Sequence, residues 1–235
     1  MYKPPVTGAL ILSDGTLFRG YGLGAVGSAV GEVCFNTAMT GYQEILTDPS
    51  YAGQIINFTF PHIGNVGTNP EDIETACSAA ADSGVRGCII KADVTQPANY
   101  RAVQHLDEWL KAKNIVGLAG IDTRALTSLI RENGMPNGVI VNEPDGNIDL
   151  DAALAKAKDF PGLEGMDLAK DVTCGQRYTS DESEWVWNEG YGTQSAPKHH
   201  VVAMDFGIKK NILRCLASSG CKVTVVPAHT SADDI

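Results

Sequence analysis

Short apolar runs separated by turn residues make up the first 65 residues of the chain. The segment is rich in glycine and β-branched residues, and dipeptides such as Asp14-Gly15 interrupt the runs. Short runs bounded by such turns are typical of strands. We therefore predict a β-rich unit with strands over Ala9–Leu12, Thr16–Phe18, Val33–Phe35 and Gln54–Phe58.

The following stretch alternates between strand and helix patterns. Arg86–Lys91 and Ile115–Ala119 have strand character, and Tyr100–Lys113 between them carries apolar residues at helical spacing. Asp122 can cap a second helix that ends near Asn133-Gly134, where glycine accommodates a left-handed C-cap. The order of these elements indicates a mixed α/β domain.

The next part of the chain is predicted to connect two domains. Gly138–Val141 offers one more strand, and Asp149 or Asp151 can open a short helix. Val172–Lys198 then turns polar and irregular. We interpret residues 151–198 as a connecting segment.

The last part of the chain has the pattern of one βαβ unit. VVAMDFG is a buried strand that runs into Gly207, KKNILRCLASSG is an amphipathic helix, and CKVTVVP is a second strand. A parallel pair of strands needs further strands and helices to bury both of its faces. Because Thr230-Ser231 would start the next helix, residues 199–235 are expected to begin a doubly wound domain that is incomplete at Ile235.

Composition and charge exclude several classes of protein. Hydrophobic residues make up 43% and charged residues 20%, which is an ordinary globular balance. The net charge of −10 disfavours binding to nucleic acid or to an anionic membrane surface. The densest basic group, Lys209, Lys210 and Arg214, is interpreted as a solvated helix face. Because we find no secretory signal and no membrane-spanning run, we expect a cytoplasmic protein.

The residue types that carry chemistry do not form a recognisable centre. The six cysteines are scattered, with no C-x-x-C pair, and none of the five histidines has metal-ligand spacing. Cys215 lies inside a predicted helix and Cys221 begins a strand, so neither is a convincing nucleophile. We therefore predict reduced, mostly buried thiols and no metal site or cofactor in this chain.

Two glycine motifs have simple structural interpretations. The sequence GLGAVG, with Gly22, Gly24 and Gly27, matches the G-x-G-x-x-G fingerprint of dinucleotide-binding proteins. A true fingerprint would indicate a nicotinamide-dependent enzyme. A strand rather than a helix is predicted to follow, so we interpret it as a glycine-rich turn. Asp205-Phe206-Gly207 is interpreted as a strand end at which glycine permits a tight turn. Thr47–Tyr51, with the letters TDPSY, is likewise a turn, in which the Ser50 hydroxyl could also bind a ligand.

Three long segments resemble one known family. FNTAMTGYQEILTDPSYAGQIINFTFPHIGNVG (Phe35–Gly67) closely resembles the signature of the small chain of carbamoyl-phosphate synthetase. The resemblance continues through GLAGIDTRALTSLIRENG (Gly117–Gly134) and VVAMDFGIKKNILRCLASSGCKVTVVPAHTSA (Val201–Ala232). It therefore covers essentially the whole chain.

The resemblance implies a fold of two domains. It implies an N-terminal β-rich α/β domain over residues 1–150, the connector, and the first βαβ unit of an incomplete doubly wound, flavodoxin-like class I glutamine amidotransferase domain over residues 199–235. In the family a cysteine thiolate attacks the side-chain amide of glutamine, a histidine transfers protons, and a glutamate orients the histidine. All three are expected beyond Ile235, so this chain alone is expected to be inactive.

The resemblance also implies a partner and one substrate contact. Ammonia passes to a large chain, which uses ATP, Mg²⁺ and bicarbonate to make carbamoyl phosphate for arginine and pyrimidine synthesis. The serine of the D-P-S-Y motif matches Ser50, whose hydroxyl helps to hold L-glutamine. The other matching residues of the signature are assigned to domain packing or to the subunit interface: Gly41, Tyr42, Gln43, Glu44 and His62. Lys209 and Asn211 also match the family, and solvation and local hydrogen bonds explain them. The alternative function is a non-catalytic module that docks on the large chain.

Overall fold

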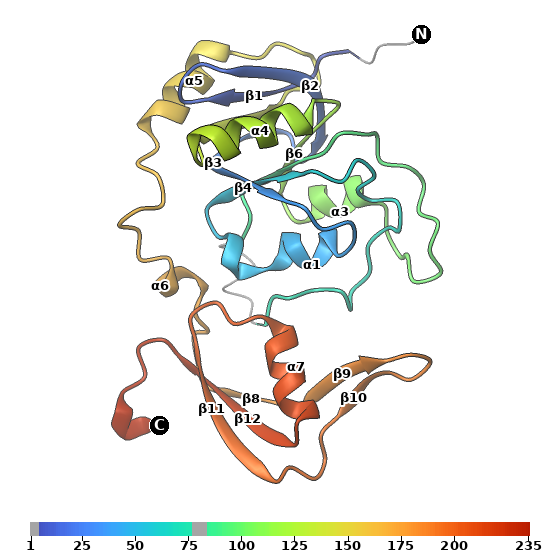
Figure 1. Cartoon of the computed structure of the whole chain (residues 1–235), viewed down its shortest axis with the longest axis vertical. Helices are drawn as coiled ribbons and strands as arrows, with labels where there is room; N and C mark the ends of the chain where they lie inside the picture. The colour runs from blue at the N-terminus through green and yellow to red at the C-terminus, as the bar shows by residue number, and fades with distance from the viewer. Residues whose placement is uncertain (1–4, 77–83) are drawn as a thin grey trace. The chain divides into compact units, whose positions relative to one another are not determined.

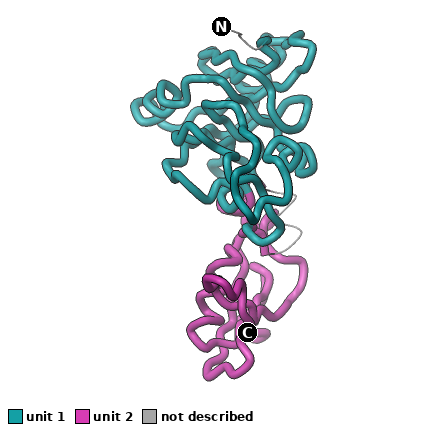
Figure 2. Tube along the Cα trace, turned by 90° about the vertical axis from the view of Figure 1, so that its right-hand side faces the viewer, with its two compact units in different colours: residues 1–46, 53–72, 85–165 teal, residues 47–52, 73–84, 166–235 magenta. Residues whose placement is uncertain are grey.

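A computed structural model describes residues 5–76 and 84–235 of the chain (Figure 1). The chain forms two compact units, which are coloured separately in Figure 2. Unit 1 comprises residues 1–46, 53–72 and 85–165, and unit 2 comprises residues 47–52, 73–84 and 166–235. The predicted domain limits at residues 150 and 198 stay predictions. Within the described ranges, no helix has the length and apolar character needed to cross a bilayer.

Unit 1 is built on seven strands that close into a barrel in the order β1-β2-β6-β5-β4-β3-β7. The strands are β1 Gly8–Leu12, β2 Leu17–Gly24, β3 Gly27–Asn36, β4 Gln54–Phe58, β5 Gly87–Ile89, β6 Val116–Ala119 and β7 Asn137–Asn142. The pairs β3–β4, β4–β5 and β5–β6 are parallel, and the other pairs are antiparallel. Closure leaves no open sheet edge. The prediction of a β-rich N-terminal α/β domain is confirmed.

Alternating side chains of the strands serve two cores. In β1, Leu10 and Leu12 join one buried cluster with residues such as Ile55 and Ile140, whereas Ala9 and Ile11 join another. The second cluster includes two alanines of α5 (Leu150–Asp159). Each fully buried leucine or isoleucine contributes about 1.5–3 kcal/mol relative to leaving it exposed. This double burial explains why β1 is apolar at every position.

The helices of unit 1 begin and end at capping residues. Asp122 Oδ1 accepts hydrogen bonds from the backbone N–H groups of Arg124 (3.1 Å) and Ala125 (3.0 Å), which starts α4 (Thr123–Asn133) as predicted. Gly134 ends α4 at a φ of 87°, also as predicted. Asp149 caps α5 in the same way. The remaining helix that lies wholly in unit 1 is α3 (Leu106–Ala112), and α1 spans Tyr42–Thr47.

Helix α3 is shorter than the predicted helix over residues 100–113. The backbone N–H of Val103 donates to the carbonyl of Thr68 at 2.9 Å, so this part of the chain is paired with another loop. The helix begins only after His105, whose ring accepts a hydrogen bond from the Asp107 N–H. Pairing between segments distant in sequence therefore overrides the helical spacing.

The glycines of GLGAVG make room for close packing. A methyl group at Gly22 would lie 1.7 Å from Oδ1 of Asn142, and the Asn142 amide donates to the carbonyl of Ala25 at 2.9 Å. The Gly24 N–H donates to Asp107 Oδ1 at 2.7 Å. The turn itself is confined to Ala25-Val26, because β2 ends at Gly24 and β3 begins at Gly27, so the predicted turn is shorter than the motif, whereas the predicted strand after it is confirmed.

Unit 2 contains the predicted βαβ unit. Strands β11 (His199–Asp205) and β12 (Cys221–Pro227) are parallel and are joined by α7 (Lys210–Ser218). The prediction of an irregular segment over residues 172–198 is wrong in part, because it contains three short strands: β8 Tyr178–Ser180, β9 Glu182–Val186 and β10 Gly190–Thr193. Strand β8 pairs with β12, and β9 pairs with β10. The other elements among the described residues of unit 2 are α6 Ala169–Val172 and the 3₁₀ turns η1 Pro49–Tyr51 and η2 Ala232–Asp234.

The β9–β10 hairpin is fastened to α7 by charged side chains. Glu182 Oε2 lies 2.6 Å from Arg214 Nε and 3.0 Å from Lys210 Nζ, and the Arg214 guanidinium lies 3.7 Å from the centre of the Tyr191 ring. Burial raises the pKa of Glu182, but the hydrogen bonds from Arg214 and Lys210 outweigh it and lower the pKa overall. Arg214 is 3% exposed, so its assignment to a solvated face is wrong.

Candidate functional site

The turn that contains Ser50 follows from its local sequence. Asp48 Oδ1 accepts a hydrogen bond from the Ser50 N–H at 2.9 Å, and Pro49 occupies the first position of the 3₁₀ turn η1. Aspartate at the cap and proline directly after it are preferred at such a start. The Asp48 side chain is buried, whereas Ser50 is exposed. The turn therefore presents Ser50 to solvent on a fixed backbone.

The carboxyl end of β11 is held by Asp205, which is 1% exposed. Its Oδ1 accepts hydrogen bonds from the N–H groups of Gly207 (2.9 Å) and Ile208 (2.8 Å), and its Oδ2 accepts one from Cys174 (2.8 Å). Gly207 has a φ of 91°, and a methyl group there would lie 3.4 Å from Pro49 Cβ. The predicted tight turn at Gly207 is confirmed. The turn of Ser50 lies directly against it.

An ion pair joins the two turns. Lys209 Nζ lies 2.6 Å from Asp48 Oδ2, and the exposed fractions of the two side chains are 44% and 5%. The hydrogen bond to Asp48 raises the pKa of Lys209 and outweighs the opposing effect of burial. One carboxylate thus bonds Ser50 with one oxygen and Lys209 with the other. Lys209 is thus half-exposed, as solvation and local hydrogen bonding predict, but its partner lies in a segment distant in the sequence.

A third segment completes this cluster. The carbonyl of Glu74 accepts the Lys210 N–H and its Oε2 accepts the Asn211 N–H, both at 2.9 Å. Lys209, at the N-cap position of α7, makes no side-chain cap, so Glu74 satisfies N–H groups that would otherwise lack partners. Thr47 Oγ1 accepts the Glu74 N–H at 2.9 Å. Sequence reasoning missed the role of Glu74, because no local pattern marks a cap supplied from another segment.

The cluster occupies the position at which α/β sheets bind ligands. Ligands of such sheets bind beyond the carboxyl ends of parallel strands, and Ser50 and Lys209 both lie at the carboxyl end of β11. The Ser50 hydroxyl can donate and accept hydrogen bonds, and the Lys209 ammonium group can donate them. This edge of the sheet therefore carries two side chains of the kind that bind polar ligands.

The described thiols of Cys88 and Cys215 have raised pKa values. Cys88 is fully buried, and burial raises its pKa to about 12. The pKa of the exposed Cys215 is also raised, first by desolvation and then by Glu184. The prediction of mostly buried thiols is confirmed for the described cysteines. A group of three or more residues able to hold a metal ion is not found in residues 5–76 and 84–235.

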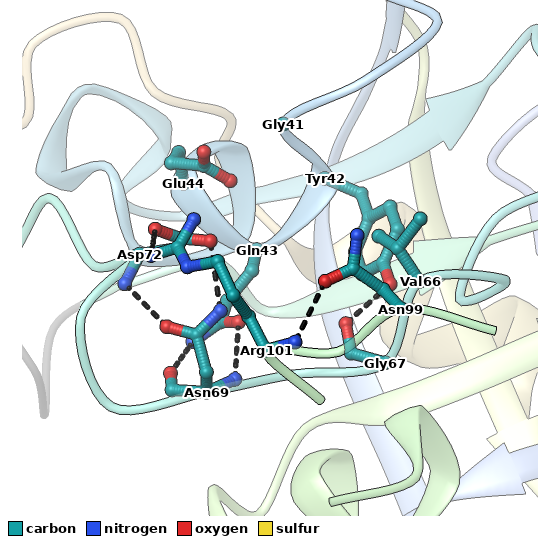
Figure 3. Close-up of a pocket in the computed structure, with 10 residues that line it drawn as sticks. All are labelled: Gly41, Tyr42, Gln43, Glu44, Val66, Gly67, Asn69, Asp72, Asn99 and Arg101. Carbon is teal, nitrogen blue, oxygen red and sulfur yellow. Dashed lines mark hydrogen bonds and ion pairs between the residues drawn. The ribbon is translucent and has the colours of Figure 1, made fainter. Parts of the chain in front are cut away.

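Other residues of the D-P-S-Y signature lie in unit 1 around a polar pocket (Figure 3). Tyr42 is 4% exposed and its hydroxyl donates to the carbonyl of Gly67. Gln43 is 3% exposed, and its side-chain amide pairs with the backbone of Asn69. Both side chains therefore serve the packing of unit 1. His62 is exposed and meets Phe60 edge-on.

The pocket has a volume of about 180 Å³. Its lining is Gly41, Tyr42, Gln43, Glu44, Val66, Gly67, Asn69, Asp72, Asn99 and Arg101. Arg101 pairs with Asp72 at 2.7 Å and with Glu71 at 3.0 Å. Large apolar side chains are exposed on the loops of this region: Met39, Val66, Tyr100 and Val103. A polar pocket thus lies near exposed apolar residues of unit 1.

Comparison with known proteins identifies the family. Residues 10–140 match the family model described as the carbamoyl-phosphate synthase small chain, CPSase domain. The carbamoyl phosphate synthase small chain of Bradyrhizobium diazoefficiens is 63% identical over 234 residues, which cover 100% of this chain and 58% of the relative. The small chain of Mesorhizobium japonicum is 63% identical over 229 residues, which cover 97% of this chain and 57% of the relative. The small chain of Caulobacter vibrioides is 59% identical over 232 residues, which cover 99% of this chain and 60% of the relative.

The chain thus spans less than two thirds of the length of these relatives, while the matched model covers more than half of the chain. The barrel of unit 1 contains most of the matched residues. The resemblance seen in the sequence is confirmed by these matches. The chain belongs to the family of the carbamoyl-phosphate synthase small chain.

Proposed function

We propose that this chain is part of a glutamine-hydrolysing subunit that supplies ammonia to a large synthetase chain. The large chain binds ATP and Mg²⁺ and makes carbamoyl phosphate from bicarbonate, for arginine and pyrimidine synthesis in the cytoplasm. The observation that carries the proposal is the pairing of Ser50 and Lys209 through Asp48 at the carboxyl end of β11. Ligands of open α/β sheets bind beyond such an edge.

In this proposal the described residues bind substrate and do not break bonds. The Ser50 hydroxyl hydrogen-bonds L-glutamine, and Lys209 places positive charge beside it. A cysteine thiolate beyond Ile235 attacks the side-chain amide, so that a thioester forms and ammonia leaves with a proton from a histidine. Water then hydrolyses the thioester to glutamate and regenerates the thiol. A glutamate orients the histidine.

The test compares Ser50→Ala in the full-length chain with the unmodified protein. Loss of one hydrogen bond to glutamine should raise KM for glutamine by about tenfold, since such a bond contributes roughly 0.5–1.5 kcal/mol, and more with a charged partner. Ser128→Ala, an exposed serine on α4 in unit 1, is the matched control and should leave KM unchanged. The 235-residue chain alone should release no ammonia. Ammonia release by it would contradict the placement of the nucleophile.

A docking module is the second candidate function. The exposed apolar residues near the polar pocket of unit 1 favour it, because exposed large apolar side chains are candidates for contact with a partner. The partner would be the large chain, which would contact the exposed Tyr100 and Val103. Tyr100→Ser and Val103→Ser should then weaken co-purification with the large chain. Met135→Ser, which changes another exposed apolar residue of unit 1, should not.

A further inference from the structure

Asp48 is the link between the proposed substrate contact and the sheet of unit 2. We propose that Asp48 is a positioning residue, whose carboxylate sets the orientation in which Ser50 binds glutamine. This inference rests on the proposed function. It assigns a role to a residue that would not touch the substrate.

Both oxygens of the Asp48 carboxylate are committed to the site. Oδ1 accepts the Ser50 N–H at 2.9 Å, and Oδ2 bonds Lys209 Nζ at 2.6 Å. The side chain is 5% exposed. A carboxylate buried to this degree is unfavourable unless its bonds are made, so the turn is held to the geometry in which both are made.

The cap of the turn alone could not set the orientation of Ser50 relative to β11. The 3₁₀ turn η1 contains three residues, and its internal hydrogen bonds fix only its own backbone. The bond to Lys209 ties the turn to the loop after β11, and Asp205 holds that loop with bonds to Gly207 and Ile208. Asp48 is therefore the charged bridge between Ser50 and the rigid strand.

The substitution Asp48→Asn distinguishes the ion pair with Lys209 from the cap bond to the Ser50 N–H. Asparagine caps a helix or turn as well as aspartate does, so Asp48→Asn keeps the bond to the Ser50 N–H. It carries no charge and loses the ion pair with Lys209. The matched control is Asp122→Asn, since Asp122 caps α4 in unit 1 in the same way and has no ion pair among the described residues.

The experiment measures glutamine hydrolysis by the full-length chain and its large partner. Asp48→Asn should raise KM for glutamine by about tenfold with a smaller change in kcat, and Asp122→Asn should change neither. In the Ser50→Ala background Asp48→Asn should add much less than it does alone, because it acts through Ser50. Additive effects of the two substitutions would overturn the inference.

Two further outcomes separate this inference from the function on which it rests. If Ser50→Ala raises KM and Asp48→Asn does not, the positioning role is refuted while the glutamine site stands. If the unmodified full-length protein does not hydrolyse glutamine, the proposed function itself fails. Should Asp48→Asn unfold the protein, Lys209→Gln breaks the same bond from its more exposed end, and its effect is measured with and without Ser50→Ala because Lys209 itself is placed beside glutamine. An unchanged KM in Lys209→Gln would then overturn the inference.

Discussion

Replacement of Asp205 by alanine should destabilise unit 2 more than any single capping substitution in unit 1. Asp205 is 1% exposed, and its carboxylate accepts three backbone N–H bonds of 2.8–2.9 Å, from Gly207, Ile208 and Cys174. Alanine removes the carboxylate, so all three N–H groups lose their hydrogen-bond acceptor. The loop that carries Lys209 would lose its attachment to β11.

The expected cost follows from these contacts. A hydrogen bond to a charged group contributes roughly 1.5–3 kcal/mol, and a buried donor without a partner costs about 1–3 kcal/mol. Some of the freed N–H groups would reach water, so the terms do not add in full. We expect a loss of about 3–5 kcal/mol in the free energy of unfolding of unit 2. Asp205→Asn keeps one acceptor oxygen and should cost less.

Amide hydrogen exchange followed by mass spectrometry measures this loss in each unit separately. Peptides from β11 and β12 should lose protection in Asp205→Ala, while peptides from the barrel of unit 1 keep theirs. The control is Asp122→Ala, which removes an exposed cap and should cost about 1 kcal/mol in unit 1. A loss in unit 2 below about 1 kcal/mol would show that the Asp205 bonds do not hold the loop.

Three other perturbations have definite expected results. The pKa of Glu182 is lower in the folded than in the unfolded protein. The ionised Glu182 therefore stabilises the fold above the ordinary glutamate pKa, and this stabilisation is lost as the pH falls through the pKa of the folded protein. In Glu182→Gln, the midpoint of thermal unfolding should depend less on pH in the acid range. Gly22→Ala places a methyl group 1.7 Å from the Asn142 oxygen, so it should lower the free energy of unfolding, measured in urea, by at least about 2 kcal/mol. An unchanged free energy of unfolding would show that Asn142 moves freely out of the way. A thiol reagent at neutral pH should label the exposed Cys215 but not Cys88, whose burial raises its pKa to about 12; native labelling of Cys88 would contradict its burial.

Most of the regular elements could be predicted from the sequence, because their signals are local. The strands of the barrel follow from short apolar runs, and α4 follows from Asp122 at its start and Gly134 at its end. The turn of Ser50 follows from Asp48 and Pro49 in the same way. These signals act over a few residues, so they do not depend on the rest of the fold.

The errors occur where distant segments meet. Strand β8 is polar and short, and it forms a strand because β12 offers it hydrogen-bond partners. Arg214 resembles a solvated cation in its helix, yet the β9–β10 hairpin buries it against Glu182 and Tyr191. The spacing of residues along α7 does not show which other segment covers the face of the helix that carries Arg214.

The sequence alone therefore determined the type and order of most elements, the family, and Ser50 as the residue to test. Only the tertiary structure decided that Asp48 bonds Lys209 and that Glu74 caps α7. Each of these contacts joins residues more than 100 positions apart. Its free energy depends on the partner that folding brings near, whereas propensities and turn signals reflect only the nearest neighbours along the chain.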